Sequence, residues 1–500
     1  MGFLPVKQLL YGARADVWPR EALIGLKLVS PDDPACAAVE ETESLTDAAQ
    51  AHDRIRFFLK DRLVRNFRDV GRAWARESGP VSVEVAGCEH LDEGSRLFFE
   101  TLATLDLGIT VRLLHGAAGP DVSPAYQENA RERRIEHLCS TAASPGEGDL
   151  DFLMEEAGRY LSLGDGWSAE RILHAVLNHR GTPEVWGKLG LSYAMQSRTM
   201  EAEFCYLRWR ESTSAVAAAG ADYALSMLYA RHHPPFLRSL DKTAEFLEHG
   251  YALLRESQPD GVEDLDFHRV FNRNGYALVA FRRGRVDEAI ALLTDGIARL
   301  RSGSAKNHMH QTVLLYNLAQ CHRRSGQHAE AIRVYRQLLE FDGKMPEYHM
   351  ELAHCHLDLG EFTEALARLL TARDLGPSIQ EVHSLLGFTY LQLGRTEEAV
   401  DAYRAALAFV PDDTDALYDL AYALGESEEP ASALELLLSA DLHGLPADSA
   451  ARFLTLTAEQ HAAAGDLPAA RQALEEVVVL APDDCDARAN LDQVVAAMTG

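Results

Sequence analysis

The sequence predicts a mainly α protein, an α-α superhelix of helical hairpins behind a small N-terminal α/β domain. Residues 346–413 contain two consecutive segments that repeat at an offset of 34 residues, with Gly360 and Gly394 at equivalent positions. Within each segment apolar residues recur every three or four positions, which is the stripe of an amphipathic helix. The chain has 500 residues, more than one compact core usually holds, and stacked repeats accommodate such a length.

Residues 1–145 show no repeat and are expected to form the small α/β domain. One or two helices are predicted over residues 45–79. Two β-like runs follow, PVSVEVAG at residues 80–87 and ITVRLLHG at residues 109–116, and a helical pattern separates them. A strand, a helix and a strand in this order predict a βαβ unit with two parallel strands.

The repeats are predicted to occupy residues 150–484, after a linker at residues 142–149. Glycine and alanine landmarks indicate about nine helical hairpins. The hairpin at residues 217–260 is irregular, and its HHPPF sequence at residues 232–236 is predicted to act as a hinge. Residues 485–500 are predicted to form a capping helix over the last apolar face.

Six residues carry a specific repeat signature, namely Gly387, Tyr390, Ala399, Tyr403, Ala406 and Pro411. With them, residues 150–500 resemble the tetratricopeptide repeat family. The resemblance implies a right-handed superhelix with a concave groove that binds a protein or peptide. The groove residues it implies are Asn274, Arg282, Tyr316, Gln320, Arg324, Met350, His354, Phe388, Gln392, Tyr418 and Tyr422. The lysine and asparagine pattern that clamps a chain end in some members is not reproduced, since Asn274 and Asn317 are expected to be isolated.

The first β-like run and the helix after it are similar to part of the STAND-type signalling ATPases, which carry tandem repeats behind a nucleotide-binding domain. His90, Asp92 and Ser95 resemble the tail of that motif. However, Ala86 and Gly87 stand where the family has its acidic residues, and the sequence contains no GxxxxGK[ST] loop for phosphates. The resemblance therefore implies a degenerate domain with a dead nucleotide site.

The negative charge is concentrated in the C-terminal third. The formal net charge is -28, and residues 341–500 alone carry 8 basic and 29 acidic residues. Such a surface repels nucleic acid and favours a basic protein partner. The alternative is that acidic faces only keep the repeat array in solution.

A metal site is not expected, although four residues group in one helix: His349, His354, Cys355 and His356. The repeat register separates them, because His322, His356 and His461 occupy the same position of three different repeats. Equivalent positions on stacked helices lie about 8–10 Å apart, too far to share a zinc ion at about 2.0–2.3 Å. No catalytic motif such as G-x-S-x-G or H-E-x-x-H occurs, so no catalytic residue and no cofactor is predicted.

The predicted function is that of an adaptor or scaffold whose groove recruits a partner protein, and not that of an enzyme. Two alternatives remain: a regulatory signalling protein derived from a repeat-containing ATPase, and a substrate-recruiting accessory subunit of a biosynthetic or modifying enzyme. Seven scattered cysteines and the lack of a leader or a long apolar run favour a cytoplasmic protein. The partner and the oligomeric state stay open.

Overall fold

The structure is a computed structural model that falls into two compact units, Met1–Tyr348 and His349–Gly500. It describes residues 2–11, 18–38, 60–105, 107–116, 128–140, 145–257, 265–300, 305–427, 430–442 and 444–499. The division falls inside one repeat helix, whereas the sequence predicted boundaries near residues 145–150 and 485. The predicted three-part division remains a prediction.

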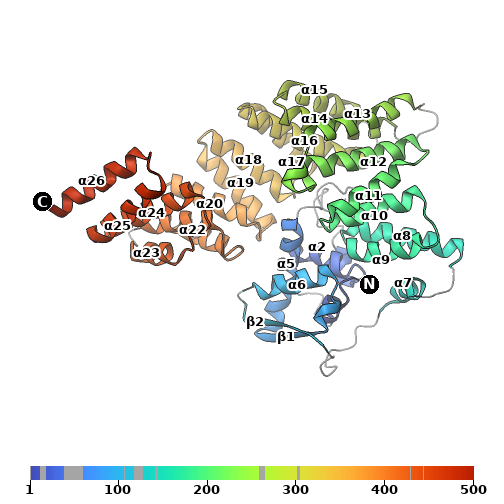
Figure 1. Cartoon of the computed structure of the whole chain (residues 1–500), viewed down its shortest axis with the longest axis horizontal. Helices are drawn as coiled ribbons and strands as arrows, with labels where there is room; N and C mark the ends of the chain where they lie inside the picture. Colours follow the sequence, from blue (N-terminus) through green and yellow to red (C-terminus); the bar gives the residue numbers. More distant parts are fainter. Residues whose placement is uncertain are drawn as a thin grey trace. The chain divides into compact units, whose positions relative to one another are not determined.

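The first unit begins with a small α/β region, as predicted (Figure 1). Its elements are α1 (Leu4–Leu10), α2 (Arg20–Val29), η2 (Pro34–Ala38), α5 (Lys60–Ser78), β1 (Val81–Ala86), η4 (Cys88–His90), α6 (Glu93–Ala103) and β2 (Ile109–Leu114). The two strands pair in parallel, from Val81 opposite Ile109 to Ala86 opposite Leu114. The helix expected to end near Gly79 ends at Ser78, where Gly79 takes a left-handed φ of 65°. The part of that expected helix before Lys60 lies outside the described residues.

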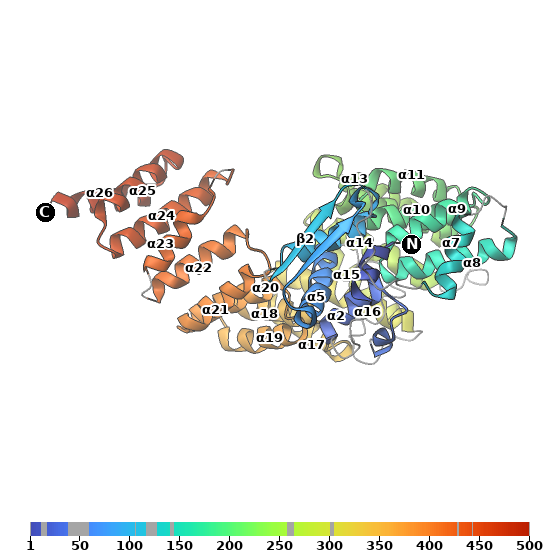
Figure 2. The same cartoon turned by 90° about the horizontal axis from the view of Figure 1, so that it is seen from below.

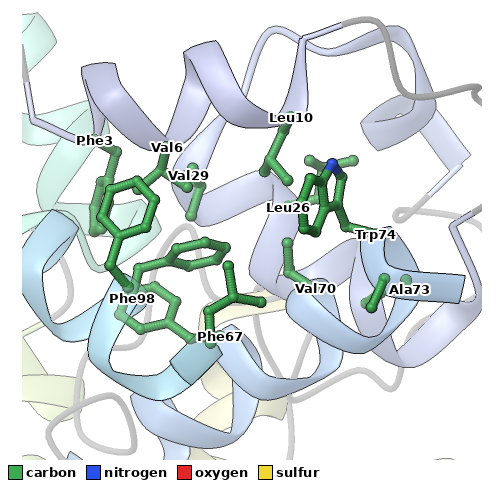
Figure 3. Close-up of a cluster of buried hydrophobic side chains, with 14 of the residues drawn as sticks. Phe3, Val6, Leu10, Leu26, Val29, Phe67, Val70, Ala73, Trp74 and Phe98 are labelled. Atoms are coloured by element: carbon green, nitrogen blue, oxygen red, sulfur yellow. The ribbon is translucent and has the colours of Figure 1, made fainter. Parts of the chain in front are cut away.

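Aromatic side chains join this region to the first repeat hairpin. Phe3, Phe67 and Phe98 gather in one cluster in Figure 3, and all three are buried. The ring of Phe3 also packs edge-on against Trp167 of the first hairpin, with a centroid distance of 5.5 Å. A Cβ on Gly94 would lie 2.8 Å from both the Phe3 and the Trp167 rings, so only glycine allows α6 to approach them this closely. The aromatic core of the α/β region therefore extends to Trp167 of the first hairpin.

Polar contacts fix the same junction. The Gly2 amide donates to the Ser168 hydroxyl at 2.9 Å. Lys7 Nζ lies 2.6 Å from Glu132 Oε1, and both side chains are 3% exposed. Farther along the first unit, Arg65 Nη2 lies 2.9 Å from Glu347 Oε1. The α/β region thus contacts the repeats both at their beginning and near residue 347.

The described residues form nine helical pairs after α7 (Ala130–Ser140). In the first unit they are α8 (Glu147–Leu163) with α9 (Gly166–Leu177), α10 (Pro183–Met195) with α11 (Thr199–Arg210), α12 (Ala215–Met227) with α13 (Leu240–Glu256), α14 (Leu265–Arg282) with α15 (Val286–Arg299), and α16 (Ala305–Arg324) with α17 (His328–Phe341). The next pair, α18 (Pro346–Asp358) with α19 (Phe362–Leu375), begins at the boundary between the units. The second unit continues with α20 (Gln380–Gln392), α21 (Thr396–Leu407), α22 (Thr414–Glu426), α23 (Pro430–Ser439), α24 (Ala447–Ala463), α25 (Leu467–Leu480) and the last helix α26 (Cys485–Thr499), which lie against each other in chain order (Figure 2). Because α8 begins at Glu147, the last residues of the predicted linker are helical.

Small residues set the distance between the two helices of a pair. A Cβ on Gly387 of α20 would lie 2.6 Å from Tyr403 Cζ of α21, so the tyrosine ring rests directly on the glycine backbone. Ala399 and Ala406 are fully buried, as their spacing predicted. Gly394 ends the turn between the helices with a φ of 69°, a conformation that side chains disfavour.

The irregular third hairpin is packed rather than open. Helix α12 continues into a π-helical turn, η5 (Leu228–His232), and a short 3₁₀ turn, η6 (Pro235–Leu237), precedes α13. His233 is fully buried, and its Nδ1 lies 3.2 Å from the Thr199 hydroxyl of the preceding hairpin. The Ser239 amide donates to the Tyr229 carbonyl at 3.0 Å. These contacts oppose the predicted hinge, because bending here would break buried hydrogen bonds.

We expect Lys7→Met to destabilise the first unit by about 3 kcal/mol, because it leaves the buried Glu132 carboxylate without its cation. The double variant Lys7→Met/Glu132→Gln should recover most of that loss, since the glutamine is neutral and can still accept the hydrogen bond that the Asn129 amide donates to Glu132. Urea unfolding followed by tryptophan fluorescence measures both. Equal destabilisation of the single and double variants would show that the ion pair is not what matters.

Candidate functional site

The groove residues predicted from the sequence lie on the first helices of their hairpins, but in both units. Asn274 and Arg282 lie on α14, and Tyr316, Gln320 and Arg324 lie on α16, all in the first unit. In the second unit Met350 and His354 lie on α18, Phe388 and Gln392 on α20, and Tyr418 and Tyr422 on α22.

In the first unit, several of these residues serve internal packing. Asn274 is only 7% exposed, and its side-chain oxygen accepts a hydrogen bond from Asn317 Nδ2 at 2.8 Å. The two asparagines were expected to be isolated, and this expectation was wrong: the stacking of α14 and α16 pairs them. The Tyr316 ring lies against Tyr335 and Tyr348, with centroid distances of 6.3 and 5.9 Å. These side chains offer little surface to a ligand.

Arg282 and Arg324 instead belong to a group of positive charges beside the π-helical turn. The Arg282 guanidinium donates to the Ala230 carbonyl at 2.5 Å, and Arg238 Nε donates to the His233 carbonyl at 2.7 Å. Burial lowers the pKa of Arg282, and the charges of Arg231, Arg238 and Arg324 lower it further. We call these four side chains the arginine cluster. Within the described part of the chain, none of the four pairs with a carboxylate.

Two of these four arginines are among the groove residues predicted from the sequence. Arg282 and Arg324 follow from the repeat register, because both occupy groove positions of regular hairpins. Arg231 and Arg238 flank the HHPPF sequence, where the repeat pattern is lost and gives no position to read. The π-helical turn, a local distortion that is frequent at functional sites, brings them to Arg282.

In the second unit, residues from consecutive first helices meet. His354 Nε2 of α18 lies 3.4 Å from Glu381 Oε1 of α20. The Arg452 guanidinium of α24 lies over the Tyr418 ring of α22, 4.4 Å from its centroid. Side chains on the first helices of neighbouring hairpins therefore contact one another, and Tyr418 and Arg452 occupy equivalent positions 34 residues apart.

This part of the second unit is aromatic and exposed. Phe388 is 43% exposed and Tyr422 is 42% exposed, which is unusual for large aromatic side chains. Gln392 is also exposed, whereas Met350 is only 7% exposed and packs internally. Phe388 and Tyr422 are thus the predicted aromatic residues with surface to offer, whereas Tyr418 is half-buried beneath Arg452.

Carboxylates surround these rings. Burial raises the pKa of Asp419 to about 6, and the nearby Asp415 and Asp413 add to the shift while Arg452 opposes it. The Glu426 carboxylate raises the pKa of Tyr422, and partial burial contributes. The local potential is therefore negative, because little positive charge offsets these groups.

We call the surface of the second unit formed by these residues the acidic-aromatic face. Its members are Glu381, Phe388, Asp415, Tyr418, Asp419, Tyr422, Glu426 and Glu459. The sequence analysis named its tyrosines and phenylalanine but not its acidic residues. Most of these could have been found by extending the same helix positions to Glu381, Asp415, Glu426 and Glu459.

The repeated histidines have a structural role in their own turns. His356 Nδ1 lies 2.6 Å from Glu361 Oε2, and the equivalent His322 Nδ1 lies 2.6 Å from Gln327 Oε1. Each histidine therefore fixes the turn of its own hairpin. Another group of possible metal ligands lies elsewhere, since Cys88, Glu89 and His115 hold their donor atoms within 4.8 Å of one another.

The residues that resemble an ATPase motif also have structural partners. Asp92 caps α6 by accepting a hydrogen bond from the Ser95 amide at 2.7 Å, and its other oxygen accepts one from the Phe3 amide at 3.2 Å. Ser95 is fully buried. The side chain of His90 is 86% exposed. Asp92 and Ser95 thus anchor the N-terminus to α6.

Tetratricopeptide repeat models match residues 269–344, 350–414 and 451–476. The chain therefore carries tetratricopeptide repeats in both units. No curated protein sequence matches it. Across the described residues, no helix is long and apolar enough to cross a membrane.

Similar solved structures are also repeat proteins. YrrB, described as a tetratricopeptide repeat protein with an unusual peptide-binding site, is 17% identical over 35% of this chain and 89% of its own, with a TM-score of 0.32. The C-terminal part of a repeat protein from Cytophaga hutchinsonii is 13% identical over 49% of this chain and 94% of its own, with a TM-score of 0.39. A repeat protein from Parabacteroides merdae is 12% identical over 56% of this chain and 99% of its own, with a TM-score of 0.37.

We expect Asp419→Asn to stabilise the second unit at about pH 7.5 and to have little effect at about pH 4.5. A carboxyl whose folded pKa is raised from 3.8 to about 6 favours the folded state while it is protonated. That contribution is fully present below the unfolded pKa and is lost as the pH rises through about 6. Thermal unfolding by circular dichroism at both pH values measures the difference. Asp401→Asn, at an 81% exposed side chain of α21, is the matched control, and an equal gain in that variant would contradict this origin.

Proposed function

We propose that this chain is a tetratricopeptide repeat adaptor whose second unit binds a basic, extended peptide segment of a partner protein along the acidic-aromatic face. One observation supports the proposal: exposed aromatic rings and carboxylates lie on consecutive first helices of the second unit, which has few basic residues. The residues on that surface suit the side chains of a basic segment.

The charge of the second unit supports a cationic ligand. Residues 349–500 contain 7 arginine and lysine residues against 27 aspartate and glutamate residues. Asp419, with its pKa near 6, is ionised only at a cost in the free protein. A bound arginine or lysine would offset that cost, because an opposite charge nearby favours the ionised carboxyl.

The aromatic residues suit the same ligand. A guanidinium or ammonium group over the ring of Phe388 or Tyr422 gains about 0.5–1 kcal/mol at an exposed site. The apolar stems of arginine and lysine cover aromatic surface while their charged ends reach carboxylates. Arg452 over Tyr418 already shows this arrangement within the protein.

The spacing of the repeats suits an extended segment. Neighbouring packed helices lie about 8–10 Å apart, and an extended chain advances about 3.3 Å per residue. About every third residue of such a peptide therefore meets the next hairpin. A helical ligand advances only about 1.5 Å per residue, so it would need more residues than an extended ligand to reach the next hairpin.

Two other functions remain open. One is a regulatory protein derived from a repeat-containing signalling ATPase with a dead nucleotide site, and nucleotide binding by the full chain would support that origin. In this chain Asp92 accepts hydrogen bonds from the Phe3 and Ser95 amides. A substrate-recruiting accessory subunit would use the same face, and its partner would be a modifying or biosynthetic enzyme or that enzyme's substrate. A cytoplasmic, non-catalytic role is part of the proposal in each case.

The direct test is fluorescence anisotropy with the full chain and a labelled peptide rich in arginine and lysine. A control peptide carries glutamine at every basic position. We expect binding of the basic peptide, weaker binding as salt rises, and about tenfold weaker binding for Phe388→Ala/Tyr422→Ala. Binding should also weaken as the pH falls below about 6, because Asp419 is then protonated.

Charge reversal gives the matched comparison. Glu381→Lys/Glu426→Lys changes the face, whereas Glu364→Lys/Glu397→Lys makes the same change in net charge on the exposed surfaces of the second helices α19 and α21. Loss of binding in the first variant alone supports the face. Equal loss of peptide binding in both variants would show that only the net charge of the chain matters. Equal binding of the basic and the glutamine peptide would overturn the proposal.

A further inference from the structure

The carboxyl ends of the two parallel strands bring two turns together in the α/β region. Ala86 pairs with Leu114 as the last residues of β1 and β2. Gly87 follows β1 with a left-handed φ of 67° and leads directly into η4. His115 follows β2. Because the strands are parallel and in register, these turns leave the sheet at the same edge.

Three ligand-type side chains meet there. The Cys88 sulfur, a Glu89 carboxylate oxygen and a His115 ring nitrogen lie within 4.8 Å of one another. Cys88 is 2% exposed, whereas Glu89 and His115 face solvent. The thiol therefore forms the floor of the group, and the other two ligands close over it from solvent.

Hydrogen bonds hold the two turns in place without using the ligand atoms of Cys88 or His115. The Gly116 amide donates to both Glu89 oxygens, at 3.2 and 3.4 Å, which ties the turn after β2 to η4. Arg96 Nη2 donates to the Cys88 carbonyl at 2.9 Å and fixes η4 on α6. These hydrogen bonds hold the turn after β2 and η4 close to each other and to α6.

From this arrangement we propose that Cys88, Glu89 and His115 bind a zinc ion. Thiolate, imidazole and carboxylate are the ligands that zinc uses, whereas calcium and magnesium prefer oxygen alone. Metal–ligand distances of about 2.0–2.3 Å require the donor atoms to approach to about 3.3–3.8 Å. Exposed side chains such as His115 reach this by a change of rotamer.

The site keeps a position open beyond its three protein ligands. Water fills the fourth position of such zinc sites. His90 Nε2 lies 3.9 Å from Glu89 Oε1, so it also stands at this edge of the sheet. A bound ion would link the turns after both strands and stabilise a two-stranded sheet, a unit that has little stability alone.

The test is titration of the reduced, tag-free full chain with Co²⁺, followed by displacement with Zn²⁺. A thiolate ligand gives a cobalt charge-transfer band in the near ultraviolet, and a tetrahedral site gives intense visible bands. We expect one equivalent of Co²⁺ per chain to produce both the charge-transfer band and the visible bands. Cys88→Ser should abolish the charge-transfer band, and His115→Ala should weaken binding at least about tenfold.

Matched variants separate this site from adventitious binding. Cys485→Ser removes an exposed cysteine of the second unit and should leave the spectrum unchanged. Glu89→Gln and His115→Ala alter exposed side chains, so circular dichroism should show intact folding. Binding should weaken at lower pH, because the thiol and imidazole must lose their protons. A spectrum that survives Cys88→Ser, or no stoichiometric binding by the unaltered chain, would overturn the site.

Discussion

The close approach of paired helices at glycine is the constraint on which the repeat array depends. Gly190 in the first unit and Gly387 in the second occupy the same repeat position, and a Cβ on either would lie 2.6 Å from a tyrosine ring, that of Tyr206 or Tyr403. The ring fills the space that the missing side chain leaves. The two helices of each hairpin are thereby held at a fixed distance, and this distance sets the spacing of the residues on their surface.

The same scaffold carries two surfaces of opposite charge. In the first unit the π-helical turn at Leu228–His232 gathers the arginine cluster around Arg282, and the described residues give it no carboxylate partner. In the second unit the acidic-aromatic face surrounds Tyr418 and Tyr422 with carboxylates. A repeat framework permits this because exposed positions are free to vary while the buried glycines, alanines and tyrosines are not.

The α/β region has its own hydrophobic core and packs directly on the first hairpin. Its N-terminus ends in a hydrogen bond to Ser168, and the Phe3 ring reaches Trp167 of the first hairpin. The parallel strands leave one edge at which Cys88 and His115 meet. The region thus packs against the beginning of the repeats. It also holds a group of possible metal ligands just after β1 and β2.

The sequence by itself determined the repeat fold, the βαβ order and the ends of many helices, because periodicity, glycine and alanine spacing act locally along the chain. It also assigned Phe388, Tyr418 and Tyr422 to the first helices of their hairpins. Only the tertiary structure paired Asn274 with Asn317 and buried Met350, since these outcomes depend on neighbouring helices. Only it joined Cys88 to His115, because two strands distant in sequence must first lie side by side.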